Sequence, residues 1–98
     1  MKQNVKIAIT GTFRIAGGVT VDKVPIPLNM SFAGSRDIDL SPPTISVSYA
    51  VKGAETETYD IGITINNITK HIPGKIDDSG YVHNTKDFQF SDFNLQPT

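Results

Sequence analysis

Residues 5–15 read VKIAITGTFRI, in which an apolar side chain or a glycine occupies every second position. Strict alternation is typical of a β-strand with one face in a core and the other toward solvent. Residues 45–51 and 59–65 repeat the pattern with Ile, Val and Tyr, and no window of helical length shows an apolar stripe with a helical period. The sequence therefore predicts an all-β protein.

A glycine pair follows the first stretch, and residues 24–32 then alternate in the opposite phase. We expect an antiparallel hairpin with a loop at residues 16–18 and a bulge at Asp22-Lys23 that brings the apolar residues of both strands into register. Pro25 and Pro27 lack the amide hydrogen that a ladder needs. They predict that the second strand lies at the edge of a sheet.

The rest of the chain divides into short strands separated by turn residues. We expect loops or turns at residues 33–36, 52–55, 73–74 and 77–80, and short strands at residues 38–40, 68–72, 81–83, 88–90 and 93–95, with a bulge at residues 91–92. Seven or eight strands favour an antiparallel β-sandwich, immunoglobulin-like or a similar Greek key, with a small flattened barrel as the alternative. No linker divides the chain, so residues 1–98 should form a single domain.

Composition excludes several classes of function. Nine basic and ten acidic residues give a net charge of -1, so no strong field attracts phosphate, and we expect no nucleic-acid partner. The absence of cysteine excludes disulfides and thiolate chemistry. No apolar run approaches the roughly 20 residues that span a bilayer, and the first residues do not resemble a signal peptide, which favours a cytoplasmic location.

No catalytic motif stands out. His71 and His83 are the only side chains that ordinarily titrate near neutrality, and no spacing joins them to a nucleophile or to metal ligands. We interpret both as surface or structural residues. The sequence therefore predicts neither an enzyme nor a cofactor.

Polar loops offer a candidate site for a small ligand. Carboxylates in such loops could supply oxygen ligands to calcium, although their spacing matches no EF-hand. A sugar ring needs an aromatic platform, and only one tyrosine lies outside the expected core positions. The candidate ligand residues are Arg36, Asp37, Asp77, Asp78 and Tyr81.

The outward positions of the clearest strands carry small, uncharged residues, where exposed strands usually carry Lys and Glu. Such a face could pack on another subunit, a partner protein or a ligand, although Thr and Ser also simply suit exposed strands. The candidate interaction residues are Thr10, Thr12, Ser46, Ser48 and Thr64. Ala8, Ala50 and Gly62 belong to the same pattern.

The Phe-rich segment at residues 88–95 either closes the core or adds to the sheet of a neighbour. A domain of this size needs its aromatic side chains inside, so we expect them in the core. The whole pattern predicts a non-enzymatic protein-interaction or structural assembly module that binds a partner or itself through strand faces or a sheet edge. The alternative is a module that binds carbohydrate or calcium through its polar loops.

Overall fold

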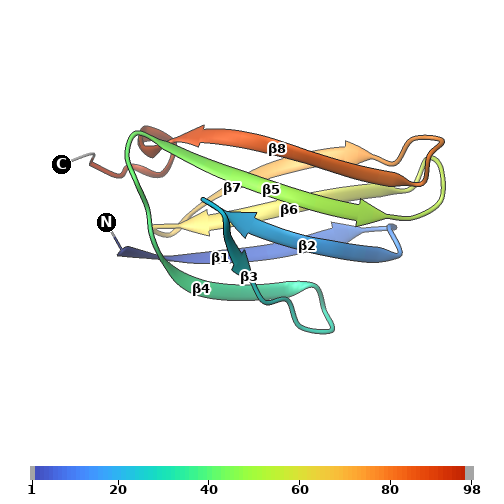
Figure 1. Ribbon diagram of the computed structural model, residues 1–98, viewed down its shortest axis with the longest axis horizontal. Coiled ribbons are helices and arrows are strands. Elements are labelled where there is room, and N and C mark those ends of the chain that lie inside the picture. The colour runs from blue at the N-terminus through green and yellow to red at the C-terminus, as the bar shows by residue number, and fades with distance from the viewer. Residues whose placement is uncertain (1, 97–98) are drawn as a thin grey trace.

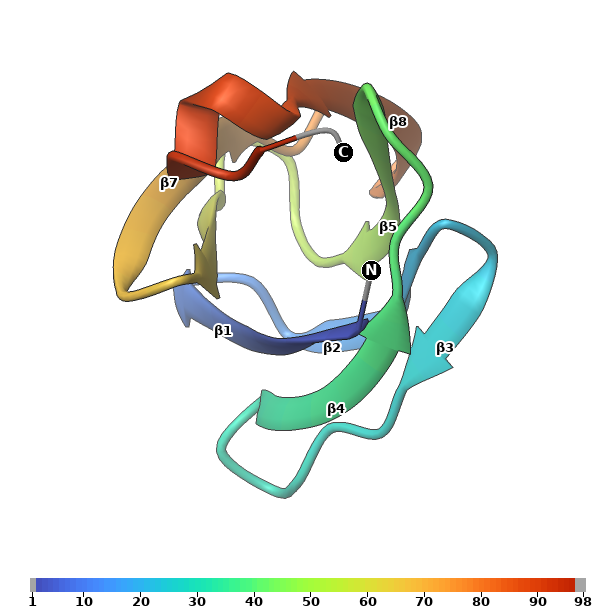
Figure 2. The same ribbon diagram turned by 90° about the vertical axis from the view of Figure 1, so that its left-hand side faces the viewer.

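The computed structural model describes residues 2–96, which form two antiparallel four-stranded sheets packed face to face (Figure 1). Sheet A has the order β4-β1-β6-β7, and sheet B has the order β3-β2-β5-β8. The strands are β1 (Lys2–Gly11), β2 (Ile15–Val21), β3 (Val24–Ile26), β4 (Ala33–Asp39), β5 (Thr44–Lys52), β6 (Thr58–Ile65), β7 (Ile68–Lys75) and β8 (Tyr81–Gln89). The predicted sandwich is confirmed, and the sheets do not close into a barrel (Figure 2).

The core lies between the sheets and consists of side chains at alternate strand positions. Every second residue of β5 and β6 is buried, as are Val5, Ile7 and Ile9 of β1. Each such side chain contributes roughly 1.5–3 kcal/mol when fully buried. No polar or charged residue among residues 2–96 is buried, so apolar packing holds the two sheets together.

The predicted hairpin between the first two strands is wrong, because β1 and β2 belong to opposite sheets. β1 ends at Gly11, where φ is 134° and a Cβ would lie 2.3 Å from the backbone oxygen of Thr58. Only glycine accepts both constraints. The same Thr58 oxygen accepts hydrogen bonds from the amides of Thr12 and Phe13 at 3.0 and 3.1 Å, which hold the chain as it crosses to sheet B.

Asp22 and Lys23 form a tight turn instead of the expected bulge. Their φ values of 48° and 68° are both positive, as a type I′ turn requires, and they join β2 to β3. Asn66 and Asn67, with φ values of 55° and 62°, join β6 to β7 in the same way. The expected loop at residues 16–18 is wrong too, because the glycine pair lies inside β2, where the register with β5 shifts.

β3 is an edge strand of sheet B, as Pro25 predicted. Residues 33–36, expected to form a loop, instead begin β4 and pair with β1. Ala33 and Gly34 have little strand propensity of their own, and this pairing overrides it.

The expected turn at Pro73-Gly74 lies inside β7. Pro73 is tolerated there because β7 is an edge strand. Gly74 lies opposite Tyr59, and a Cβ at Gly74 would lie 2.2 Å from the Tyr59 Cζ. The tyrosine ring therefore covers the glycine backbone, and this cross-strand packing keeps a turn-like dipeptide in the strand.

The C-terminal segment ends in a 3-10 helix, η1 (Phe90–Phe93), so the expected strand at residues 93–95 and the expected bulge before it are wrong. Asp92 Oδ2 accepts a hydrogen bond of 2.8 Å from the Gln89 amide and caps this turn. Figure 2 shows η1 at one end of the sandwich, where it contacts β7 and β8. The prediction that the aromatic side chains of this segment belong to the core is confirmed for Phe88, Phe90, Phe93 and Leu95.

Candidate functional site

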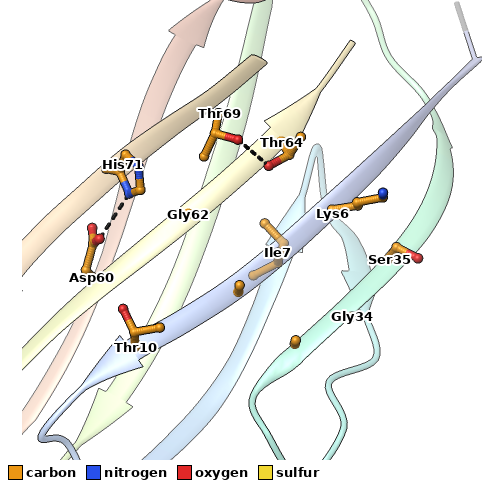
Figure 3. A pocket seen from close by; sticks show the side chains of 12 residues that line it. Lys6, Ile7, Thr10, Gly34, Ser35, Asp60, Gly62, Thr64, Thr69 and His71 are labelled. Carbon is orange, nitrogen blue, oxygen red and sulfur yellow. Dashed lines mark hydrogen bonds and ion pairs between the residues drawn. The ribbon is translucent and has the colours of Figure 1, made fainter. Parts of the chain in front are cut away.

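The outer face of sheet A is hollowed along a line that crosses its strands (Figure 3). Directly opposed residues of antiparallel neighbours share a face, and the register places Ala33, Ala8, Gly62 and His71 side by side across β4, β1, β6 and β7. Ala33, Ala8 and Gly62 have no side chain beyond Cβ. They form the floor of a hollow of ≈ 470 Å³, which we call the sheet A hollow.

Two rows of larger side chains border the sheet A hollow. On one side lie Lys6, Thr64 and Thr69, and the two threonine hydroxyls share a hydrogen bond of 2.7 Å. On the other side Thr10 lies opposite Asp60. A volume of this size falls within the range of small binding pockets, about 300–1,000 Å³. The hollow can therefore accept one or two side chains of a partner.

Asp60 and His71 form a hydrogen-bonded pair at the β7 end of the hollow. His71 Nδ1 lies 3.0 Å from Asp60 Oδ2, and the two side chains are 59% and 39% exposed. The other Asp60 oxygen, Oδ1, is buried without a hydrogen-bond partner among the described residues. The exposed oxygen of Asp60 is therefore Oδ2, and a carboxylate oxygen that accepts one hydrogen bond from a histidine can accept a second from a cationic group of a ligand.

The structure divides the five candidate interaction residues among three places. Thr10 and Thr64 border the sheet A hollow. Ser46 and Ser48 lie on the outer face of sheet B, where Ser46 Oγ donates to Asp87 at 2.7 Å and the Ser48 hydroxyl lies 2.9 Å from that of Thr85. Thr12 Oγ1 accepts a 2.9 Å hydrogen bond from the Thr58 amide, so this side chain serves the crossing between the sheets.

The candidate ligand residues do not converge. Asp37 pairs with Asn4 near the start of β1, whereas Asp77 and Asp78 follow β7 beyond the level of Gly11. Seven strand residues separate these levels, which is about 24 Å. Within residues 2–96, no group of three or more His, Asp or Glu side chains could hold a metal ion.

Arg36 and Asp77 have local partners. Arg36 Nη1 donates to the Pro25 oxygen at 3.0 Å and ties β4 to β3. The Ser79 hydroxyl and amide donate to Asp77 Oδ1 at 2.5 and 3.0 Å, and these hydrogen bonds lower the pKa of the Asp77 carboxyl. Both residues therefore serve local structure.

Tyr81 borders a second hollow, of ≈ 430 Å³, on the outer face of sheet B. Tyr81 is 43% exposed. Its ring centroid lies 6.3 Å from that of His83, and the Lys52 Nζ lies 5.6 Å from the centre of the Tyr81 ring. Ser48 lines the same hollow. Tyr81, a predicted ligand residue, and Ser48, a predicted interaction residue, thus line the same hollow.

Sequence reasoning missed Lys6 and Asp60 and assigned His71 no role in binding. Their positions around one hollow depend on the pairing of β1 with β4 and β6, and of β6 with β7. The alternation showed that Lys6 and Asp60 face outward, but alternation carries no information about which strands are neighbours.

No known protein family, curated protein or solved structure matches this chain. Among residues 2–96, no helix has the length and apolar character needed to cross a membrane.

Proposed function

We propose that this protein is a non-enzymatic interaction module that docks a protein segment on the outer face of sheet A. The observation that carries the proposal is the sheet A hollow, which combines a floor of small residues with a border of hydroxyl groups and opposite charges. An apolar side chain of the partner would lie on Ala8 and Gly62. Lys6 and Asp60, on opposite borders, would select the polar groups on either side of it.

The sheet edges support docking on the face, because each edge carries a feature that discourages strand addition. β3 has Pro25 and β7 has Pro73. On β8, Lys86 lies opposite buried Val47 and so shares its inward face, yet it is exposed. Inward charges of this kind are a known protection of edge strands.

The fourth edge, β4, is covered by the chain that connects it to β3. A Cβ at Gly34 would lie 1.9 Å from the Pro27 oxygen, and the Asn29 amide donates to the Ala33 oxygen at 2.8 Å. A partner is therefore expected to use side-chain contacts on a face and not backbone pairing along an edge.

A peptide library displayed on phage tests the proposal. Peptides selected on the wild-type protein are measured against Gly62→Val, which places a branched side chain on the floor of the hollow. A Cβ at Gly62 meets no atom closer than 3.6 Å, and branched side chains suit strands, so we expect the variant to fold. Ala54→Val adds apolar bulk in the exposed connection between β5 and β6 and is the matched control.

We expect selected peptides to bind the wild type and Ala54→Val equally and to lose at least about tenfold in affinity for Gly62→Val, about 1.4 kcal/mol. Peptides that bind all three proteins equally, or a selection that enriches nothing, would refute docking in the hollow. Circular dichroism spectra establish that both variants are folded.

A second candidate function is sugar binding on sheet B, favoured by the exposed Tyr81 ring, which lines the same hollow as Ser48. Aromatic rings offer an apolar surface with a polar tip, which suits the mixed character of a sugar. A glycan array probed with the wild type and Tyr81→Ala tests this candidate. Binding that the substitution abolishes supports it, and an array without signal refutes it.

A further inference from the structure

We infer that the segment docked on sheet A belongs to a second copy of this chain, which joins the first through the same face about a two-fold axis. This inference rests on the proposed function and names its partner. In the dimer, Lys6 of each copy enters the sheet A hollow of the other, with its aliphatic stem on Ala8 and Gly62 and its ammonium group on Asp60.

The position of Lys6 suits a contact with another molecule. It is exposed at the border of the hollow, and no ion pair joins it to another described residue. In Figure 3 its side chain points away from Asp60 and His71. A lysine places its apolar stem along apolar surface while its charged end reaches a polar partner, so it matches a hollow with a floor of alanine and glycine.

Lys6 and Asp60 are too far apart to pair within one copy. Lys6 lies opposite Thr64 and Asp60 lies opposite Thr10, so four strand positions separate their levels on the neighbouring strands β1 and β6. That offset is about 14 Å along the strands. Lys6 and Asp60 therefore cannot pair with each other within one copy.

A two-fold axis gives both Lys6 and Asp60 an opposite charge in the other copy. A two-fold interface uses the same patch on both subunits, so a contact from Lys6 to Asp60 implies the reciprocal contact. The interface then contains two identical charge pairs and two occupied hollows. Other classes of partner would have to reproduce this arrangement, whereas a second copy carries both charges at the required spacing.

The remaining charges of the face do not oppose self-association. By the strand register its outward positions carry three lysines and three aspartates, namely Lys2, Lys6, Lys75, Asp37, Asp39 and Asp60. Two such faces have no net repulsion. Opposite charges across an interface also favour encounter and fix its orientation.

The size of the face limits the area that a dimer can bury. Four strands about 4.8 Å apart and about eight residues long present roughly 500 Å² in projection. Stable interfaces usually bury about 800 Å² on each partner. We therefore expect a dimer with a dissociation constant in the micromolar range, and sedimentation velocity from about 1 µM to about 1 mM covers it.

Charge exchange distinguishes self-association from other contacts. Lys6→Glu places two carboxylates together in each contact, and Asp60→Lys places two ammonium groups together. Each variant alone should dimerise at least about tenfold more weakly than the wild type. An equimolar mixture of the two variants should regain the dimer, because Glu at position 6 of one copy meets Lys at position 60 of the other. The double variant should regain it for the same reason.

Lys23→Glu and Asp78→Lys make the same charge changes in exposed turns away from sheet A, and they should dimerise like the wild type. Three results would overturn the inference: a wild type that stays monomeric throughout the range, single variants that dimerise normally, or folded single variants whose mixture and double variant stay monomeric. A monomeric wild type whose hollow still binds selected peptides would refute the second copy alone and leave the proposed function standing.

Discussion

Replacement of Phe93 by alanine tests the role of the C-terminal turn in closing the core. Phe93 is 0% exposed, and its ring centroid lies 5.7 Å from that of Phe88 at an interplanar angle of 64°. Removal of a buried phenylalanine costs about 3–5 kcal/mol, since the apolar contact is lost and a cavity remains. Small domains have about 5–15 kcal/mol of stability in total. Phe93→Ala should therefore remove a large fraction of it.

For a domain of this length, each kcal/mol shifts the melting temperature by about 4–8 °C, so we expect a fall of about 12–40 °C. Urea unfolding followed by far-ultraviolet circular dichroism gives the corresponding free energy. Met30→Ala is the matched control, because Met30 is 98% exposed and its truncation should change stability by less than about 0.5 kcal/mol. A loss below about 1 kcal/mol for Phe93→Ala would show that η1 does not close the core.

Three further predictions concern single contacts. Gly74→Ala should destabilise the fold by about 1–3 kcal/mol in urea unfolding, because the new Cβ would overlap the Tyr59 ring; equal stability would contradict that packing. Burial raises the pKa of Tyr59 to about 12 from 10.0, so stability should fall as pH rises from 10.0 to about 12, and Tyr59→Phe should flatten this slope in alkaline titrations. The Ser79 hydrogen bonds lower the pKa of Asp77, which adds stability above pH 3.8 that is lost as pH falls through the lowered pKa. Ser79→Ala should raise that pKa toward 3.8 in a carbon-13 NMR titration, and an unchanged value would argue against the hydroxyl contact.

Strands with strict alternation could be predicted closely from the sequence. Residues 45–51 and 59–65 lie within β5 and β6, because each strand buries one full face against the other sheet. The same alternation gave a wrong prediction at the end of β1. Apolar alternation continues through Phe13 and Ile15, although the chain crosses from sheet A to sheet B between Gly11 and Ile15, and Ile15 is 57% exposed. A period of two reports which side of a strand is apolar and does not report where one sheet ends.

Turn chemistry explains the other differences. Asp22-Lys23 lacks the glycine that marks most two-residue hairpins, so this turn could not be recognised from the sequence. Pro73-Gly74 has turn composition, but packing against Tyr59 decides its conformation. In the candidate site, Thr10 and Thr64 were predicted from their outward positions, whereas the neighbourhood of Lys6, Asp60 and His71 follows from strand pairing, which no local pattern encodes.

The placement of β1 in the middle of sheet A has a consequence for synthesis of the chain. Both strands that flank it come much later, since β4 starts at Ala33 and β6 starts at Thr58. β1 therefore waits with one backbone edge open until β4 has followed, and with the other edge open until β6 has followed, when more than half of these 98 residues have been made. Such distant pairing slows folding, because the chain loses the entropy of closing long loops before it gains the free energy of the strand contacts. Nascent chains of this protein should therefore depend on chaperones most strongly in the interval before β6 emerges.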